Sequence, residues 1–136
     1  MSMPAMINSL PHILISEADE KRLTAIATAA SQRVPEVSAA LLSELERADI
    51  WPETAMPADV VRIGSIVEFG VDDGRRLKLQ LVLPENADIN AKRISVLTPV
   101  GAALIGLSPR QSMEWSGNDG KERVLTVLTV SHPQSD

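Results

Sequence analysis

The residues that most often carry catalysis are few in this chain and poorly placed for it. The 136-residue sequence has two histidines, His12 and His132, and no cysteine. Each histidine lies near one end of the chain, so a catalytic triad or a histidine general base would have to be assembled from the termini. Without cysteine there is no disulfide, no thiolate nucleophile and none of the usual structural zinc sites. The histidines and the absence of cysteine therefore do not indicate a catalytic function.

The carboxylates do not form a pattern that suggests acid–base chemistry either. Glu44 and Glu46 are two positions apart on a predicted helix, so they point to different faces and are expected to be solvated. Asp72 and Asp73 precede Gly74 in a predicted turn, which explains them without catalysis. Neither Gly-x-Gly-x-x-Gly nor Gly-x-x-x-x-Gly-Lys, the two common nucleotide cradles, occurs. Nothing in the spacing recommends a metal site, and we predict a protein that is not an enzyme and needs no cofactor.

Charge and composition argue against several classes of partner. The formal net charge is −5, and basic residues form no cluster larger than a pair such as Arg75–Arg76. We therefore predict no direct nucleic-acid binding. The apolar runs are too short to span a membrane, and the N-terminus lacks the basic and apolar segments of a signal peptide. We expect a cytoplasmic monomer that does not bind membranes.

The elements that would position these residues begin with a helical hairpin over residues 13–50. Residues 1–12 have two prolines and no periodicity, and are expected to form a loose tail. Ser16 suits the N-cap of a first helix, and Pro35 suits the first position of a second. Each predicted arm is about 20 Å long. Apolar residues recur at helical spacing in both arms, namely Leu23, Ile26, Ala27 and Ala30, then Val37, Leu41, Leu45 and Ala48.

A sheet domain is predicted over residues 59–131, after a linker with two prolines at 51–58 and before a C-terminal tail at 132–136. Alternation of apolar and polar residues indicates antiparallel strands with one solvated face. The last strand is apolar on both faces, so it is expected to lie centrally with cover on both sides. The predicted fold class is α+β. The strands are expected at 65–71, 75–83, 94–98, 111–115 and 122–130.

The stretch LTPVGAALIG, residues 97–106, predicts a short helix between two strands. Thr98 suits an N-cap before Pro99 at the first helical position, and Gly106 suits the left-handed residue that ends a helix. Gly101, in the first turn, lowers the helix propensity by about 1 kcal/mol relative to alanine but lets another backbone approach closely. Two roles are open for it: tight packing of the helix on its own sheet, which composition favours, and a docking site for a partner.

Several segments resemble known families. ISVLTPVGAALIG resembles the C-terminal domain of the transcript-cleavage Gre factors, in which Ser-Pro-Leu/Ile-Gly follows a strand. LLSELERADI, MPADVV and SIVEF resemble the narrower Rnk family, named as regulators of nucleoside diphosphate kinase and built on the Gre domain. The resemblance covers nearly all of residues 13–130. It implies an FKBP-like C-terminal domain, an N-terminal antiparallel coiled coil much shorter than that of Gre factors, and binding to bacterial RNA polymerase near its secondary channel.

Carried over by position, the resemblance puts Thr98, Pro99, Val100 and Gly101 in the loop with which Gre-type domains touch the polymerase. Ala102 stands where those domains have a basic residue, so one possible ionic contact is lost. In Gre factors, acidic residues on a long coiled-coil tip reach the polymerase's catalytic magnesium, where a carboxylate can help hold the metal and position water.

The predicted hairpin is about half as long as such a probe would need, and its tip offers Arg33 and Glu36 rather than an acidic pair. We therefore hypothesise a protein that docks on the polymerase without stimulating cleavage, competes with Gre factors and affects nucleoside diphosphate kinase levels indirectly.

Two alternatives come from other classes. The family name allows direct regulation of nucleoside diphosphate kinase by protein–protein contact, which the sequence cannot separate from an indirect effect through transcription. The implied FKBP-like fold allows a prolyl isomerase, whose pockets are lined by aromatic side chains. This chain has only Trp51, Phe69 and Trp115 and no tyrosine. Trp51 falls in the predicted linker, Phe69 alternates with valines as a core residue would, and Trp115 is expected at the edge of the sheet. The residues therefore argue against the isomerase.

Overall fold

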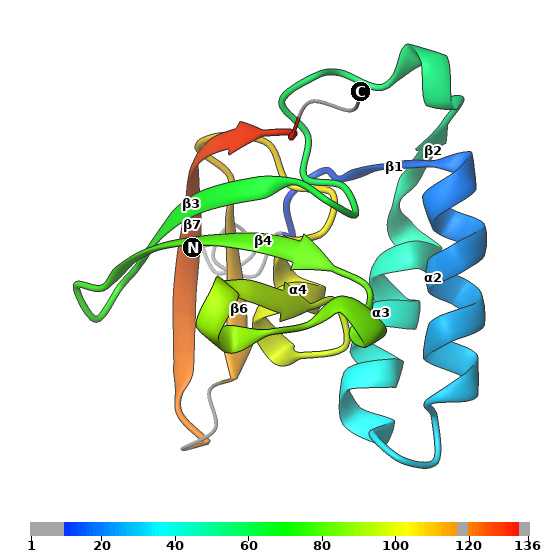
Figure 1. Ribbon diagram of the computed structural model, residues 1–136, viewed down its shortest axis with the longest axis horizontal. Coiled ribbons are helices and arrows are strands. Elements are labelled where there is room, and N and C mark those ends of the chain that lie inside the picture. The colour runs from blue at the N-terminus through cyan, green and yellow to red at the C-terminus, as the bar shows by residue number, and fades with distance from the viewer. Residues whose placement is uncertain (1–9, 117–119, 134–136) are drawn as a thin grey trace, which may run out of the picture.

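A helical hairpin packs against one side of a curled five-stranded sheet in the computed structural model, which describes residues 10–116 and 120–133 (Figure 1). The helices are α2 (Glu17–Ala29), α3 (Pro35–Arg47) and α4 (Pro99–Leu104), with short 3-10 turns η1 (Glu53–Ala55), η2 (Pro84–Asn86) and η3 (Ile89–Ala91). The strands are β1 (Leu14–Ser16), β2 (Asp49–Trp51), β3 (Ile66–Val71), β4 (Arg76–Val82), β5 (Arg93–Ser95), β6 (Ser112–Ser116) and β7 (Glu122–Ser131). The predicted α+β class is confirmed.

The hairpin forms from the local signals that the sequence carries. The Ser16 hydroxyl accepts a hydrogen bond from the Asp19 amide, 3.1 Å away, and so caps α2. Pro35 occupies the start of α3, where its missing N–H leaves no helical bond unmade. Leu23 and Leu41, one from each arm, are fully buried. The two helices have 13 residues each, or about 20 Å. Coiled-coil packing of the arms and an FKBP-like sheet domain remain predictions.

The direction of one edge strand differs from the prediction. The sheet has the order β5-β4-β3-β7-β6, and its neighbours are antiparallel except that β5 runs parallel to β4. The expectation of a purely antiparallel sheet was therefore wrong at this edge. The chain between β4 and β5 forms the turns η2 and η3 instead of a tight hairpin, so β5 re-enters the sheet in the same direction as β4.

Strand β7 lies inside the sheet, between β3 and β6, but it is not covered on both faces. Leu125 and Val127 are fully buried on one face. Leu128, which falls at the register shift between β7 and β3, is 38% exposed, so the expected cover on both sides was wrong. Hydrogen bonding along both edges of β7, rather than burial of both faces, accounts for its interior position.

The hairpin and the sheet share one hydrophobic core. Its members include Leu23 and Leu41 from the helices and Phe69, Leu104 and Leu125 from the sheet and α4. The short strands β1 and β2 pair in parallel and connect the ends of the hairpin to this body. Backbone hydrogen bonds continue the connection, because the Leu14 amide donates to the Gly106 carbonyl at 3.2 Å.

Segments predicted as tail and linker also have defined contacts. The Pro11 carbonyl accepts a hydrogen bond from the Arg47 guanidinium, and the His12 carbonyl accepts one from the Gln111 side-chain Nε2 at 2.9 Å. Trp51, predicted as the first linker residue, ends strand β2. The predicted tail at residues 1–12 lies largely outside the described residues. Across residues 10–116 and 120–133, no helix is both long enough and apolar enough to cross a bilayer.

Candidate docking surface beside helix α4

The predicted helix in LTPVGAALIG is present, and its N-terminus is fixed by Thr98. The Thr98 hydroxyl accepts a hydrogen bond from the Gly101 amide at 3.1 Å and donates one to the Ser95 carbonyl at 2.7 Å. Pro99 starts α4, and Gly106 follows its end with a left-handed φ of 83°. These contacts hold residues 98–100 in one conformation at the end of the helix.

Gly101 is required by a close approach of two backbone segments. A Cβ at this position would lie 2.2 Å from the Ser95 carbonyl oxygen and 2.9 Å from the Val96 Cα. Both atoms belong to the backbone, so no side-chain rotation could relieve the overlap. Gly101 itself is buried. Of the two roles that the sequence left open, tight packing explains this glycine, which shapes the loop without offering a contact surface of its own.

The loop borders an apolar hollow on the sheet. Thr98, Pro99 and Val100 line a hollow of about 610 Å³ together with side chains from β4, β5 and η3. Pro99 is exposed, whereas Thr98 and Val100 are half-buried. Ile89, from η3, lines the same hollow with 73% of its surface exposed. We call the set Ile89, Thr98, Pro99 and Val100 the α4 surface.

Ile89 was not anticipated from the sequence. It lies between Asp88 and Asn90 in a polar segment, and the only signal was an isolated large apolar residue where no strand or helix pattern explains one. The Asp88 side chain accepts a hydrogen bond from the Asn90 amide at 3.1 Å, and this N-cap holds Ile89 in the turn.

Two arginines stand at the edge of the hollow, and a carboxylate holds them there. Asp73 accepts hydrogen bonds from the Arg75 side chain at 2.9 Å and from the Arg123 side chain at 3.2 Å. It also accepts one from the Arg75 amide at 3.1 Å. This amide, followed by the side chains of Arg75 and Arg123, holds the pKa of Asp73 below its usual value. The predicted turn at Asp72–Gly74 is confirmed, and it positions a cationic rim beside the α4 surface.

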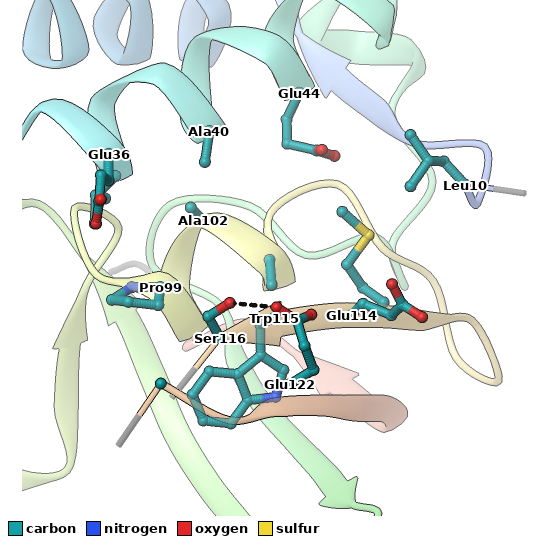
Figure 2. A pocket seen from close by; sticks show the side chains of 14 residues that line it. Leu10, Glu36, Ala40, Glu44, Pro99, Ala102, Glu114, Trp115, Ser116 and Glu122 are labelled. Carbon is teal, nitrogen blue, oxygen red and sulfur yellow. Dashed lines mark hydrogen bonds between the residues drawn. The ribbon is translucent and has the colours of Figure 1, made fainter. Parts of the chain in front are cut away.

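The two residues of the predicted hairpin tip lie in different places. Arg33 is exposed in the turn between α2 and α3. Glu36 is exposed in the first turn of α3, and it lines a second hollow together with Pro99 (Figure 2). The structure therefore brings Glu36, but not Arg33, next to the start of α4.

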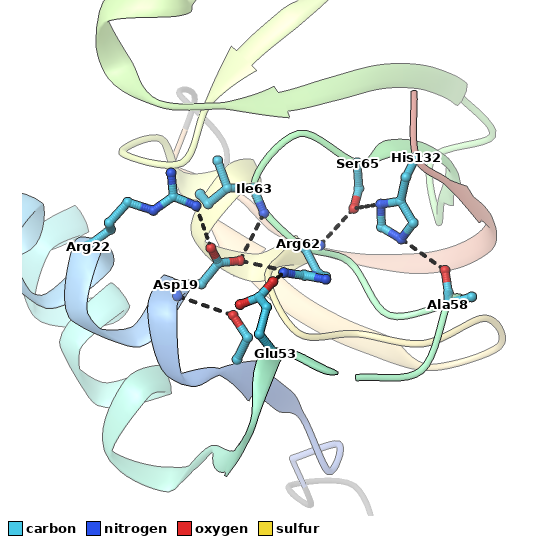
Figure 3. A network of polar contacts seen from close by, with 9 residues as sticks. Asp19, Arg22, Glu53, Ala58, Arg62, Ile63, Ser65 and His132 are labelled. Atoms are coloured by element: carbon cyan, nitrogen blue, oxygen red, sulfur yellow. Dashed lines mark hydrogen bonds and ion pairs between the residues drawn. The ribbon is translucent and has the colours of Figure 1, made fainter. Parts of the chain in front are cut away.

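A buried carboxylate that sequence reasoning missed joins the hairpin to the sheet (Figure 3). Asp19, in α2, is 2% exposed and accepts hydrogen bonds from the Arg22 side chain at 2.6 Å and the Ile63 amide at 3.3 Å. Arg62 lies 3.9 Å from the same carboxylate and also pairs with Glu53. The partners at 62 and 63 are more than 40 positions away, so no local pattern could have indicated them.

The remaining candidate groups of the sequence have structural partners. Glu44, expected to be solvated, is 8% exposed and pairs with Arg47, so that expectation was wrong. The His132 ring contacts the Ser65 hydroxyl and the Ala58 carbonyl, each at 2.9 Å, which holds the end of β7 to the segment before β3 (Figure 3). Within the described part of the chain, no three histidine, aspartate or glutamate side chains gather in a way that could hold a metal ion.

Both parts of the chain match known protein families. Residues 56–132 match the family described as transcription elongation factor, GreA/GreB, C-term, and residues 11–50 match the family described as Rnk N-terminus. The chain is 33% identical over 125 residues to the regulator of nucleoside diphosphate kinase of Escherichia coli (strain K12), and this alignment covers 91% of the chain and 92% of that protein. The chain belongs to the Rnk family.

The Rnk-family chain also resembles transcription elongation factors. It is 34% identical over 95 residues to GreA of Rhizobium leguminosarum bv. trifolii (strain WSM2304), which covers 66% of the chain and 60% of that protein. A solved structure described as a prokaryotic transcription elongation factor GreA/GreB from Nitrosomonas europaea superimposes with a TM-score of 0.71 at 32% identity, over 88% of the chain and 99% of that structure. The fold is thus GreA/GreB-like, and these relatives are named as regulators or transcription factors, not as enzymes.

Proposed function

We propose that this protein docks on bacterial RNA polymerase near its secondary channel through the α4 surface. The observation that carries the proposal is the apolar hollow beside Pro99, where Ile89 is 73% exposed. Exposed apolar side chains around a rigid loop are typical of a surface that a protein partner covers. The Gre-type resemblance implies the same loop, and the GreA/GreB C-terminal family match includes it.

We further propose that docking occurs without stimulation of transcript cleavage. Helices of 13 residues give a hairpin of about 20 Å, and Glu36 is the only acidic residue between positions 29 and 36. A short hairpin without an acidic pair at its tip is poorly suited to hold a metal ion in a distant active site. On this view, the protein competes with Gre factors for the polymerase and affects nucleoside diphosphate kinase indirectly, through transcription.

Competition binding to purified core RNA polymerase tests the docking proposal. The native chain is expected to displace a Gre factor, and the Pro99→Asp variant is expected to fail. Aspartate is favourable in the first turn of a helix, so α4 is expected to survive the change. Pro52→Asp, at an exposed proline outside the hollow, is the matched control and is expected to displace the Gre factor as the native chain does. Equal displacement by both variants would contradict docking through Pro99.

Cleavage of backtracked transcripts tests the second part of the proposal. We expect no stimulation when the native chain is added alone to a backtracked polymerase complex. Strong stimulation would overturn the non-catalytic role without bearing on the docking surface.

Direct binding to nucleoside diphosphate kinase is the second candidate function, and the name of the Escherichia coli relative, regulator of nucleoside diphosphate kinase, favours it. Co-purification of the kinase with this protein in the absence of polymerase would support direct regulation and count against the indirect route.

Prolyl isomerisation is not favoured by the aromatic residues. Phe69 and Trp115 line the hollow beside Pro99, but Phe69 is fully buried, and the Trp51 indole lies outside that hollow and donates a hydrogen bond to the Asp49 carboxylate at 3.0 Å. Turnover of a proline peptide is expected to stay at the background rate.

A further inference from the structure

A second hollow, which we call the acidic groove, runs between α3, α4 and the edge strand β6 (Figure 2). Its volume is about 830 Å³. Apolar side chains from all three elements line it, including Val37 and Ala40 from α3, Ala103 from α4 and Met113 from β6. The groove is thus a partly apolar hollow on the side of α4 that faces the hairpin. It borders the proposed polymerase contact at Pro99 and the hydrophobic core at Ala103, but neither of these accounts for its acidic side chains.

The charged side chains that line this groove are all acidic. Among the residues that the structure describes, four glutamates line it and no lysine, arginine or histidine does. Two of the four have partners: Glu44 pairs with Arg47 at 2.5 Å, and Glu122 accepts a hydrogen bond from the Ser116 hydroxyl at 2.8 Å. Glu36 and Glu114 are exposed, and among the described residues neither has an ion-pair or hydrogen-bond partner for its carboxylate.

The two unpartnered carboxylates come from opposite walls. Glu36 belongs to the first turn of α3, and Glu114 belongs to β6. An apolar floor between two negative walls complements a segment in which cationic side chains flank an apolar one. The partner's apolar side chain would be removed from water when it packs on the apolar floor, and its cationic side chains would approach Glu36 and Glu114. A nucleic-acid backbone would meet only like charge here.

We propose that the acidic groove binds a partner-protein segment in which lysine or arginine residues flank apolar side chains. The acidic groove shares Pro99 and Trp115 with the hollow of the α4 surface. The variants that test the groove change neither residue, so the two proposals can fail separately.

The neighbouring alanines of α3 supply a matched pair of test variants. Ala39 and Ala40 are both exposed, and only Ala40 lines the groove. Arginine is a good helix former, so either substitution is expected to leave α3 intact, as circular dichroism would verify. Ala40→Arg puts a cation and a long side chain inside the groove, whereas Ala39→Arg changes the net charge equally outside it. We expect Ala40→Arg to abolish binding and Ala39→Arg to preserve it.

The carboxylates supply a second matched pair. Glu36→Gln combined with Glu114→Gln removes the unpartnered charges of the groove. Glu46→Gln combined with Glu85→Gln removes two exposed charges elsewhere. We expect the first double variant to bind about tenfold more weakly than the native chain, a loss of the size that two partly exposed ion pairs provide. The second is expected to bind as the native chain does.

The probe is the short peptide acetyl-GKLKLRG-amide, with acetyl-GELELEG-amide as its acidic counterpart. Trp115 lines both the groove and the hollow of the α4 surface, so its fluorescence in a Trp51→Phe background reports peptide binding, and the variant pairs assign that binding to the groove. We expect saturable binding of the cationic peptide, weakened by salt, and none of the acidic peptide. Absence of saturable binding, or equal weakening by both members of either variant pair, would overturn the proposal. Sedimentation that shows a dimer of the native chain, lost in Ala40→Arg, would assign the groove to a second copy and overturn it as well.

Discussion

Because Gly101 has no side chain, α4 can lie very close to the segment that precedes it. In Gly101→Ala, the added Cβ would lie 2.2 Å from the Ser95 carbonyl oxygen, so the backbone of α4 would have to move. Alanine improves helix propensity by about 1 kcal/mol, but overpacking against backbone costs more. We expect the free energy of unfolding to fall by about 2 kcal/mol, measured by urea denaturation.

Gly70→Ala is the control for this change. The nearest atom to a Cβ at Gly70 is the Arg75 carbonyl oxygen at 3.9 Å, an ordinary contact distance. We expect a change of less than about 1 kcal/mol in either direction. If Gly101→Ala proved as stable as Gly70→Ala, the close approach at Ser95 would not be the reason for this glycine.

The structural roles of some residues could be predicted from their neighbours in sequence, and those of others could not. Thr98 and Gly106 could be assigned because caps and left-handed positions depend on a few neighbouring residues. Asp19 and Glu44 could not, because each looks like an ordinary helix carboxylate in sequence. Asp19 is held by the distant Ile63 amide, and Glu44 is buried by tertiary packing.

At the scale of elements, Asp19 fixes the N-terminal turn of α2 to the segment that leads into β3. Asp19→Ala would leave the Ile63 amide and two nearby guanidinium groups without their buried acceptor. Removal of one partner from a buried charge pair typically costs 3–5 kcal/mol. We expect the free energy of unfolding to fall by about 3 kcal/mol, measured by urea denaturation with far-ultraviolet circular dichroism.

Arg22→Ala tests whether burial of the carboxylate is what matters. The Arg22 side chain is half-exposed, and its ion pair with Asp19 can be replaced by water. We expect a loss below about 1 kcal/mol. Equal losses for Asp19→Ala and Arg22→Ala would show that the ion pair within α2, and not the contact with the Ile63 backbone, accounts for the stability that Asp19 contributes.

The same contrast between local and distant causes explains which elements could be predicted. Helical spacing and the capping residues predicted helices α2 and α3. Alternation of apolar and polar residues predicted strands β3, β4, β6 and β7, with bounds correct to within a few residues. The parallel direction of β5 and the pairing of β1 with β2 were not predictable. Each depends on where the chain returns after a segment without periodicity, and short strands carry little pattern of their own.

The candidate site was predictable to the same extent. The loop at residues 98–101 follows from its sequence and its resemblance to Gre factors. The hollow beside it depends on η3, whose Ile89 gave no periodic signal, and the acidic groove depends on how α3 packs over α4 and β6.

At the scale of the whole molecule, the two parts that match different families are expected to unfold together. Leu23 and Leu41 of the hairpin belong to the same buried cluster as Phe69 and Leu125 of the sheet. A hairpin of 13-residue helices has too little apolar surface of its own to stay folded alone. We therefore expect one cooperative unfolding transition for the chain.

The two tryptophans allow the unfolding of the hairpin side and of the sheet to be followed separately. Trp51 ends β2 beside the hairpin, and Trp115 lies in β6 at the edge of the sheet. In Trp115→Phe, the fluorescence of Trp51 reports on the hairpin side, and in Trp51→Phe the fluorescence of Trp115 reports on the sheet. Within each variant, the urea midpoint from fluorescence is expected to coincide with that from circular dichroism, so any loss of stability from the substitution cancels. A Trp51 transition at lower urea than the circular dichroism transition of the same variant would mean that the hairpin detaches first and that the shared core does not couple the two parts.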